Sequence, residues 1–416
     1  MSCRGDRPVF GYFPAFFFEE EEEPEEEEWV DDEWEEEETV AEAYELAPDE
    51  DEEEELPFAE EDEVMEVEEF IQEEDDVEEA WDILAGMGVD DIERFASHGG
   101  NSIRTWSTTR PRQNTRALLD AAEAHGVTVA LGLGMAPERH GFDYDDRQAV
   151  AAQLESMRAE VLKYRDHPAL LLWVIGNELN HHYTNPRVYD AVNDVAEMIH
   201  ELDPYHPATT TTSGYKPEVN AEIMARAPTL DFISFQMYGS IFRLPERLAE
   251  AGFDQPFMVT EWGTIGYWET QMTDWGAPIE VHSSDKADTF LRAYRDILVP
   301  LNGQLLGSYA FYWGQKQERT PTWFGMLTED GNLTEAVDAM QYAWTGEWPA
   351  NRTPVVKSML LDGKAAAESV VLETGRDYRA VIEVEDRAGD PVVYRWELKA
   401  ESTATSGGGD FEERIP

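Results

Sequence analysis

The run Leu170-Leu-Leu-Trp-Val-Ile-Gly-Asn-Glu178 begins with six apolar residues and ends in a carboxylate. A second run, Pro256-Phe-Met-Val-Thr-Glu261-Trp-Gly263, repeats this pattern. Short apolar runs rich in branched residues are typical of strands that are buried on both faces. A carboxylate at the end of such a strand costs free energy unless it is paired or used. The two runs therefore predict buried strands over 169–175 and 257–260, each followed by a candidate functional glutamate.

From residue 80 onward, apolar strands alternate with amphipathic helices. The eight expected strands cover residues 81–85, 102–106, 127–133, 169–175, 208–212, 231–236, 257–260 and 306–312. The helices expected after them cover residues 89–98, 114–125, 146–165, 187–202, 218–226, 244–251, 284–298 and 334–344. Eight such units in about 265 residues match the size of an α/β (β/α)8 TIM barrel. An open doubly wound sheet is the competing topology, but Gly86-Met-Gly88 is too short to form its glycine-rich phosphate loop.

Two segments of different composition flank the expected barrel, which takes residues 80–350. Residues 1–79 form an acidic low-complexity segment. Its like charges repel one another, and it has little apolar surface whose burial could offset the entropy cost of ordering, so we expect it to be mostly disordered. Residues 351–416 are expected to form a small all-β, immunoglobulin-like module. In it, the alternating stretch 378–384 would pair across a turn with a strand over 392–398. The module is shorter than the roughly 100 residues of an immunoglobulin-like sandwich, so it is either truncated or a smaller variant.

The net charge of −59 is spread over the whole chain, although residues 1–79 are the most acidic. This charge argues against nucleic acid as a partner, because DNA and RNA are polyanions. An acidic chain with few lysines fits adaptation to high salt, where screening weakens self-repulsion. A GC-rich genome combined with an acidic tail would leave the same composition.

Cellular location is not readable from the sequence. Cys3 is the only cysteine, so an internal disulfide is excluded. No apolar run approaches the ~18 residues of a membrane-spanning helix. Residues Val9–Phe18 follow Arg4 and Arg7 and faintly resemble a signal peptide, but no small-residue cleavage site comes after them.

The two glutamates suggest a chemistry. In a barrel of parallel strands, catalytic groups sit at the carboxyl-terminal rim. Glu178 and Glu261 are separated by three β-α units, so they would face each other across the mouth. Retaining glycosidases use two carboxyl groups about 5–5.5 Å apart, one protonated and one ionised. The pair therefore predicts cleavage of a glycosidic bond.

At these positions the chain resembles a known group of enzymes. Gly176-Asn177-Glu178 and Thr260-Glu261-Trp262-Gly263 are similar to the clan A glycoside hydrolases, most closely to the family 2 catalytic TIM barrel and related β-glucan-active barrels. The resemblance covers roughly residues 80–345, and the module after it resembles the β-sandwich appendages of such enzymes. It implies a retaining hydrolase of β-linked glycans, with β-glucan as the expected substrate and without a cofactor. It also implies a secreted or periplasmic enzyme, although a clear signal peptide is missing.

The resemblance also assigns roles to residues. Glu178 would be the general acid/base and Glu261 the nucleophile. Asn177 would hydrogen-bond the sugar 2-hydroxyl, and Arg104 would orient Glu261 and keep it ionised. Tyr238, in the motif Gln-Met-Tyr-Gly, would hydrogen-bond Glu261.

Aromatic side chains extend this candidate site. Trp313 would form the platform under the reacting sugar. Trp106 is a candidate substrate contact that would line a further sugar subsite, and the same holds for Trp262, Trp268 and Trp323. Each of these four rings is equally compatible with a purely structural role.

Histidines near the rim leave alternatives open. His140, together with Tyr144, is a candidate substrate contact. His181 and His182 follow Glu178 at a spacing that could bind a metal on a helix, but the surrounding asparagines indicate a loop, so substrate contact is favoured and no metal site is expected.

The sequence leaves three other functions open. A transglycosylase would use the same residues and pass the glycosyl group to another sugar instead of water. A non-catalytic carbohydrate-binding barrel would share the fold, since fold does not dictate function. A metal-dependent hydrolase would depend on the two adjacent histidines alone.

Overall fold

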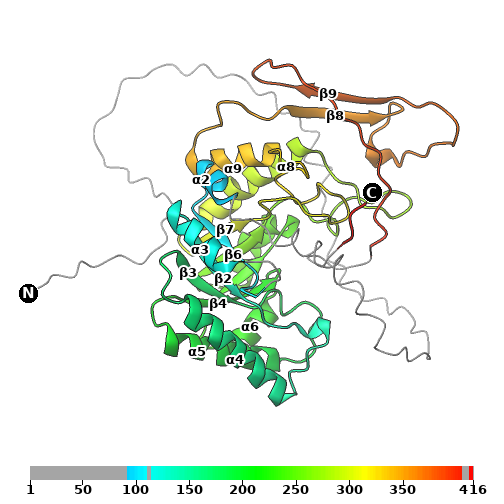
Figure 1. Ribbon diagram of the computed structural model, residues 1–416. Coiled ribbons are helices and arrows are strands. Elements are labelled where there is room, and N and C mark those ends of the chain that lie inside the picture. The colour runs from blue at the N-terminus through cyan, green and yellow to red at the C-terminus, as the bar shows by residue number, and fades with distance from the viewer. Residues whose placement is uncertain (1–90, 110–113, 405–411, 416) are drawn as a thin grey trace, which may run out of the picture. The chain divides into compact units, whose positions relative to one another are not determined.

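The computed structural model describes residues 91–109, 114–404 and 412–415. Its centre is a seven-stranded sheet in which all paired strands are parallel and neighbours follow chain order (Figure 1). The strands are β1 (Ser102–Arg104), β2 (Thr128–Leu133), β3 (Leu170–Ile175), β4 (Ala208–Ser213), β5 (Phe232–Gln236), β6 (Phe257–Trp262) and β7 (Leu305–Ala310). This order is that of a barrel and excludes a doubly wound sheet, in which the strand order reverses.

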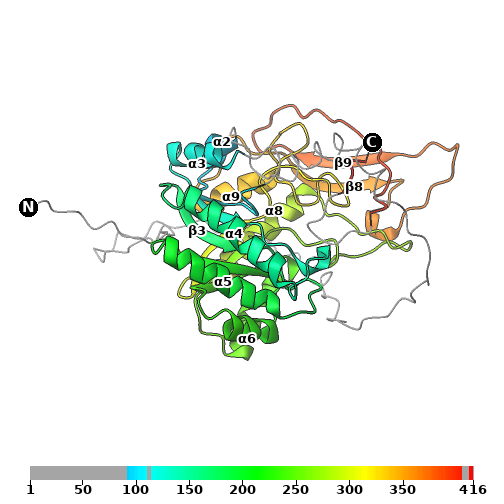
Figure 2. The ribbon, with the colours of Figure 1, turned by 60° about the horizontal axis from the view of Figure 1, so that its bottom comes forward.

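Helices lie around the strands and cover the outside of the sheet (Figures 1 and 2). They are α2 (Asp91–Ser97), α3 (Thr115–Ala124), α4 (Arg147–Tyr164), α5 (Arg187–Leu202), α6 (Pro217–Arg226), α7 (Leu244–Ala251), α8 (Ser283–Arg292) and α9 (Glu335–Thr345). Short turns of other helix types are η2 (Glu138–His140), η3 (Gly239–Arg243), η4 (Ala293–Leu298), η5 (Val299–Leu301) and η6 (Ala366–Glu368). None of the helices in the described part of the chain is both long and apolar enough to cross a bilayer.

The sheet curves until its two edge strands approach each other. Ser102 Oγ in β1 and Tyr309 OH in β7 are 3.0 Å apart and share a hydrogen bond. Within the described residues no backbone ladder joins β1 to β7, so the barrel is nearly closed. The strand expected over 81–85 lies outside the described residues, as does the acidic segment 1–79.

Most expected elements are confirmed, and the differences lie at their ends. Helices α5 and α7 have the expected bounds. The helix expected over 284–298 divides into α8 and the π-helical η4. Strand β6 continues to Trp262, beyond the expected end at 260, so Glu261 lies within the strand and not after it. The pairing of β6 with β7 shifts register between Val259 and Trp262, and this irregularity re-aims the last residues of the strand.

The pairing expected for the C-terminal segment is wrong. Strand β9 (Ala380–Glu385) is the expected alternating strand, and the turn after it is closed by Asp390 N donating to Asp386 Oδ1 at 2.8 Å. Its antiparallel partner is β8 (Val355–Leu361), not residues 392–398, which form no strand. Val355 is buried and Val356 N donates to Ser284 Oγ in α8, so β8 is held against the helix, whereas Val393 and Leu398 are almost fully exposed. A two-stranded sheet is all that the described residues of this segment show of the expected all-β module.

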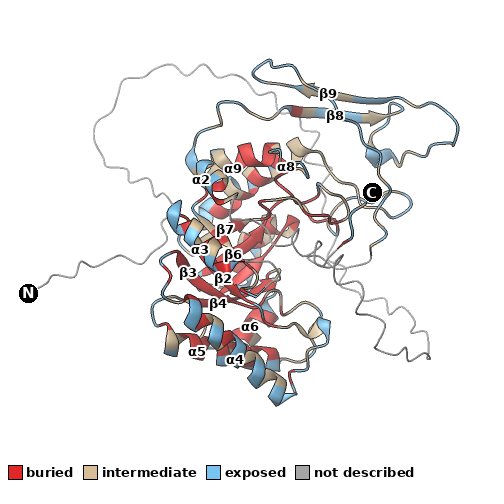
Figure 3. Cartoon of the chain, viewed as in Figure 1, coloured by how far each residue is buried: buried red, intermediate tan, exposed pale blue. Residues whose placement is uncertain are grey.

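The core lies between the strands and around them (Figure 3). Residues from five strands form one buried cluster, which places them on the concave side of the sheet: Ala130, Leu172, Val174, Phe232, Met258 and Tyr309. The threonine-rich β4 is also buried, and its hydroxyls are hydrogen-bonded: Thr210 Oγ1 donates to Ile175 O, and Thr211 Oγ1 pairs with Thr260 Oγ1. Buried hydroxyls need such partners to avoid a desolvation cost.

Gly132 of β2 lies directly against the backbone of the segment after β1. A Cβ at Gly132 would lie 2.4 Å from Thr105 O and 2.5 Å from the backbone carbon of Trp106. We expect Gly132→Ala to lower the free energy of unfolding by about 1–3 kcal/mol, because neither backbone atom can yield without moving the chain. Thermal and urea unfolding would measure the change. The control is Gly303→Ala, where the added carbon meets no atom within 4 Å; equal stability of the two variants would contradict the prediction.

Candidate functional site

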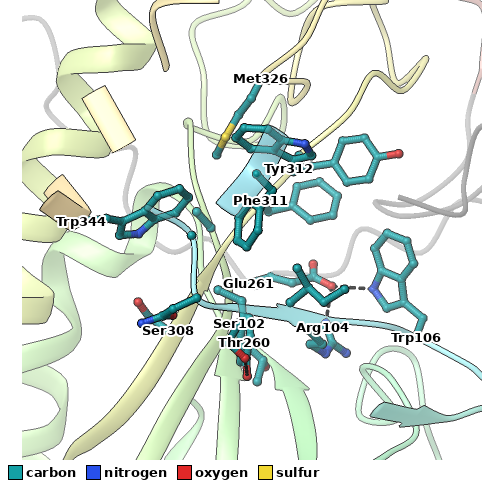
Figure 4. A pocket seen from close by; sticks show the side chains of 17 residues that line it. Ser102, Arg104, Trp106, Thr260, Glu261, Ser308, Phe311, Tyr312, Met326 and Trp344 are labelled. Carbon is teal, nitrogen blue, oxygen red and sulfur yellow. Dashed lines mark hydrogen bonds and ion pairs between the residues drawn. The ribbon is translucent and has the colours of Figure 1, made fainter. Parts of the chain in front are cut away.

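Glu261 is buried near the end of β6 and lies at the centre of the candidate site (Figure 4). Its Oε1 accepts hydrogen bonds from Arg104 Nη1 at 2.7 Å and from Trp106 Nε1 at 2.8 Å. Gln236 Nε2 donates to the same oxygen at 3.1 Å, and Tyr238 OH donates to Oε2 at 3.0 Å. Both carboxylate oxygens are therefore held, and the side chain has one orientation.

The barrel brings these donors together from separate strands. Arg104 ends β1, and its side chain is only 4% exposed, so its ion pair with Glu261 is largely removed from water. Gln236 ends β5 and is the register partner of Glu261 in β6. Tyr238 comes two residues later, at the start of the loop above β5. Charged-group hydrogen bonds in such a dry setting are stronger than those on the surface.

Asn177 joins the same network through its amide oxygen. Asn177 Oδ1 accepts from Arg104 Nη2 at 2.6 Å and from Gln236 Nε2 at 2.8 Å. Both of these bonds use the oxygen, so neither of them engages the amide nitrogen Nδ2. The side chain can thus present a donor to a ligand.

Glu178 follows β3 and adopts an unusual backbone conformation. Its φ of 48° lies in the left-handed region, which is unfavourable for residues with a side chain. The backbone is held there by its own hydrogen bonds: Glu178 N donates to Thr211 O at 3.1 Å, and Arg139 Nη1 donates to Glu178 O at 3.0 Å. Two further hydrogen bonds hold the residue Asn180, two positions after Glu178, to Ser213 at the end of β4: Asn180 Nδ2 donates to Ser213 O, and Ser213 N donates to Asn180 Oδ1.

The loop that carries Arg139 also holds the loop after Glu178. The carboxylate of Glu138 accepts from Thr184 N at 2.7 Å, from Thr184 Oγ1 at 2.6 Å and from Asn185 N at 2.9 Å. These bonds lower the pKa of Glu138, although burial opposes them. The turn η2 thus fixes the backbone on both sides of the Glu178 loop.

Glu178 and Glu261 have opposite environments. Burial and the negative charge of Glu261 together raise the pKa of Glu178 to about 8, while Arg139 and Arg104 oppose the shift. A carboxyl group with this pKa is mostly protonated at pH 7. Burial and the charge of Glu261 also raise the pKa of Tyr238, so its phenol stays a donor.

The other expected site residues are placed differently. Arg104 and Trp106 line a cavity of about 100 Å³ beside Glu261 (Figure 4). Trp313 is a further lining residue of this cavity. Its ring is 6% exposed and packs edge-on against Phe95 of α2, with ring centroids 5.2 Å apart. His140 is exposed at the end of η2 and is not among the residues that line this cavity.

Sequence reasoning assigned no role to two residues of the network. Gln236 contacts both Asn177 and Glu261, and a buried amide at the end of an apolar strand was the available signal. Arg139 contacts the backbone of Glu178 from a loop 39 residues earlier, and nothing in the local sequence indicates this contact.

The adjacent histidines do not belong to a larger cluster of metal-binding side chains. The rings of His181 and His182 pack with their centroids 4.2 Å apart. Within the residues that the structure describes, no group of three or more His, Cys, Asp or Glu side chains could hold an ion.

Comparison with known proteins supports the resemblance seen in the sequence. Residues 113–270 match the family model of the glycosyl hydrolases family 2 TIM barrel domain. This match confirms the likeness to the clan A glycoside hydrolase barrels; it covers the strands β2 to β6, with Glu178 and Glu261.

The solved structures that match this chain are distant in sequence. A Bifidobacterium dentium β-glucuronidase has 17% identity and a TM-score of 0.49, over 62% of this chain and 42% of its own. A Dictyoglomus thermophilum β-glucuronidase has 16% identity and a TM-score of 0.48, over 63% of this chain and 47% of its own. A Faecalibacterium prausnitzii β-glucuronidase has 17% identity and a TM-score of 0.47, over 62% and 45%. The chain thus spans less than half the length of these proteins.

The coupling of the two carboxyl groups can be measured. We expect Glu261→Gln to lower the pKa of Glu178 below 8, because a neutral amide no longer opposes ionisation of its neighbour. Infrared difference spectra recorded across a pH titration would follow the carboxyl group. Glu178→Gln identifies its signal by removing it, and an unchanged or higher pKa in Glu261→Gln would show that the two groups do not interact.

Proposed function

We propose that the protein is a retaining glycoside hydrolase that cleaves β-linked glycans by double displacement. The observation that carries this proposal is the pair of carboxyl groups with opposite environments. Glu261 is held by four donors, one of them a buried arginine, while burial keeps Glu178 protonated. A protonated acid beside a fixed carboxylate is the arrangement that the reaction requires. The match to the family 2 barrel supports the same conclusion.

In the first step, a carboxylate oxygen of Glu261 attacks the anomeric carbon of the bound sugar. The bond from that carbon to the leaving oxygen breaks, and Glu178 transfers its proton to this oxygen. The sugar is then an ester of Glu261, and the leaving alcohol departs. Arg104, Trp106, Gln236 and Tyr238 orient the attacking group without forming bonds to the sugar carbon.

In the second step, the ionised Glu178 takes a proton from water. The water oxygen attacks the anomeric carbon, and the ester bond to Glu261 breaks, so both glutamates return to their initial states. The esterified Glu261 carries no charge, so the electrostatic contribution that raised the pKa of Glu178 is absent in the intermediate. This change favours the ionised form of Glu178 when it must act as a base.

The substrate contacts belong to the same proposal. The amide nitrogen of Asn177 would donate to the sugar 2-hydroxyl, and Trp313 would form the platform for the reacting ring. His140 would contact more distant parts of the substrate from the end of η2. We propose a β-glucan as the substrate class, with residues 80–350 as the catalytic domain and the segments 1–79 and 351–416 outside it.

The nucleophile assignment predicts a large loss of activity. We expect Glu261→Gln to lower kcat by at least about a thousandfold on aryl β-glycosides and β-glucans, because no covalent intermediate can form. Glu178→Gln should reduce the rate by about 10²–10⁴-fold. Circular dichroism would verify folding of both variants. A folded Glu261→Gln protein with more than a few per cent of the activity would eliminate Glu261 as nucleophile, and products longer than the substrate would indicate transglycosylation.

The raised pKa of Glu178 predicts the alkaline limb of the pH profile. The protonated acid is present below about pH 8 and is lost above it, so kcat/KM should fall about tenfold per pH unit there. The measurement uses an aryl β-glycoside between about pH 5 and pH 10. A second aryl glycoside, with a leaving group acidic enough to need no proton, should lose much of this limb. A limb that is the same for both substrates would assign the titration to another group.

A further inference from the structure

One tryptophan stands out among the aromatic side chains around Glu261. The aromatic cluster is formed by buried residues: Tyr238, Tyr267, Phe311, Tyr312, Trp323 and Phe324. Trp268 packs on this cluster, with its ring centroid 4.8 Å from that of Tyr267 and 5.4 Å from that of Tyr238. Unlike the cluster residues, Trp268 is 48% exposed. A large apolar ring that packs on buried aromatic residues and stays half exposed is suited to bind a ligand.

The loop that carries Trp268 is firmly held. The neighbouring Glu269 accepts hydrogen bonds from Gly239 N at 2.8 Å and from Ser240 N at 2.7 Å, at the start of η3. The indole also lies directly against Gly266, where an added Cβ would come within 2.5 Å of the ring. These contacts restrict the position of the exposed ring, so less conformational entropy is lost when a ligand binds.

Trp268 is linked to the nucleophile through a single side chain. The ring of Tyr238 meets the indole at an interplanar angle of 88°, and its hydroxyl donates to Glu261 Oε2 at 3.0 Å. The exposed indole therefore lies next to the residue that holds the carboxylate. A ligand ring stacked on Trp268 would be a neighbour of the ring that reacts at Glu261.

We propose that Trp268 is the stacking platform of a second sugar subsite, so that the substrate is a β-linked oligosaccharide of at least two rings. This inference rests on the proposed hydrolase function. The C–H face of a pyranose is apolar and matches the flat face of an indole, while its hydroxyl groups remain in water. Trp268 thus determines the length of substrate that binds productively and takes no part in proton transfer.

The chain offers a matched control in the same loop. Trp275 is 49% exposed, so its removal deletes the same surface ring. Its indole nitrogen donates to Glu401 at 3.1 Å, whereas the Trp268 ring packs on Tyr238 and Tyr267. An effect that is specific to Trp268 therefore cannot come from the loss of any exposed tryptophan.

The test compares two substrate lengths. Aryl β-glycosides with one and with two or more sugar rings are hydrolysed by wild type, Trp268→Ala, Trp268→Phe and Trp275→Ala. We expect Trp268→Ala to lower kcat/KM on the longer substrates at least tenfold more than on the single-ring substrate. Trp268→Phe should retain part of the preference, because a smaller ring still stacks, and Trp275→Ala should match wild type.

A binding measurement separates this inference from the hydrolase proposal. The full chain with Glu261→Gln is titrated calorimetrically with β-glucan oligosaccharides, with and without Trp268→Ala. Weaker binding in the double variant supports the subsite, even if catalysis is not observed. Equal effects of Trp268→Ala on all substrate lengths, together with unchanged oligosaccharide binding, would overturn it, while inactivity of the wild type would count against the hydrolase proposal alone.

Discussion

The ion pair between Arg104 and Glu261 is the constraint on which the rest of the site depends. Both side chains are nearly removed from water, and burying two charges costs several kcal/mol per ion unless each finds good partners. The barrel supplies these partners from different strands: Gln236 from the end of β5, Tyr238 from the loop after it, and Asn177 from the loop after β3. Removing any one of them would leave a buried charge or a buried donor incompletely paired.

A fixed negative charge at Glu261 has a direct consequence for Glu178. Ionisation of Glu178 is resisted, because burial and the like charge of Glu261 both oppose it. The two glutamates have the same side chain, so the contrast between them comes from their surroundings. Burial and the charge of Glu261 raise the pKa of Glu178, while a guanidinium and three neutral donors hold Glu261 in one orientation.

Aromatic residues separate this network from solvent. Trp106 donates to Glu261 and stacks on Tyr312, Phe311 packs against Trp106, and Tyr238 packs against Phe311. Such a wall lowers the local dielectric, which strengthens every hydrogen bond to the carboxylate. Trp268 packs against Tyr238 of this group, so the packing that insulates the carboxylate also holds a partly exposed indole.

Much of the barrel could be predicted from the sequence, because its helices and strands have strong apolar periodicity. Helices α5 and α7 have their expected bounds, and Glu178 and Glu261 were recognisable as carboxylates at the ends of buried runs. The end of β6 was misplaced because Thr260, Glu261 and Trp262 do not continue an apolar pattern, although the neighbouring strands keep them in the sheet. The partner of β9 was misassigned because local alternation does not say which strand lies beside it.

The amino-acid sequence by itself determined which segments are buried strands and which helices cover them. It also determined which two carboxylates lie at the carboxyl-terminal ends of these strands. These features depend on local periodicity, which neighbouring residues carry. Only the tertiary structure decided that Arg139 holds the backbone of Glu178, that Gln236 bridges Asn177 and Glu261, and that Trp268 is exposed while Trp262 and Trp323 are buried. Such contacts join residues far apart in the chain, so they exist only once the sheet has curved and brought its strand ends together.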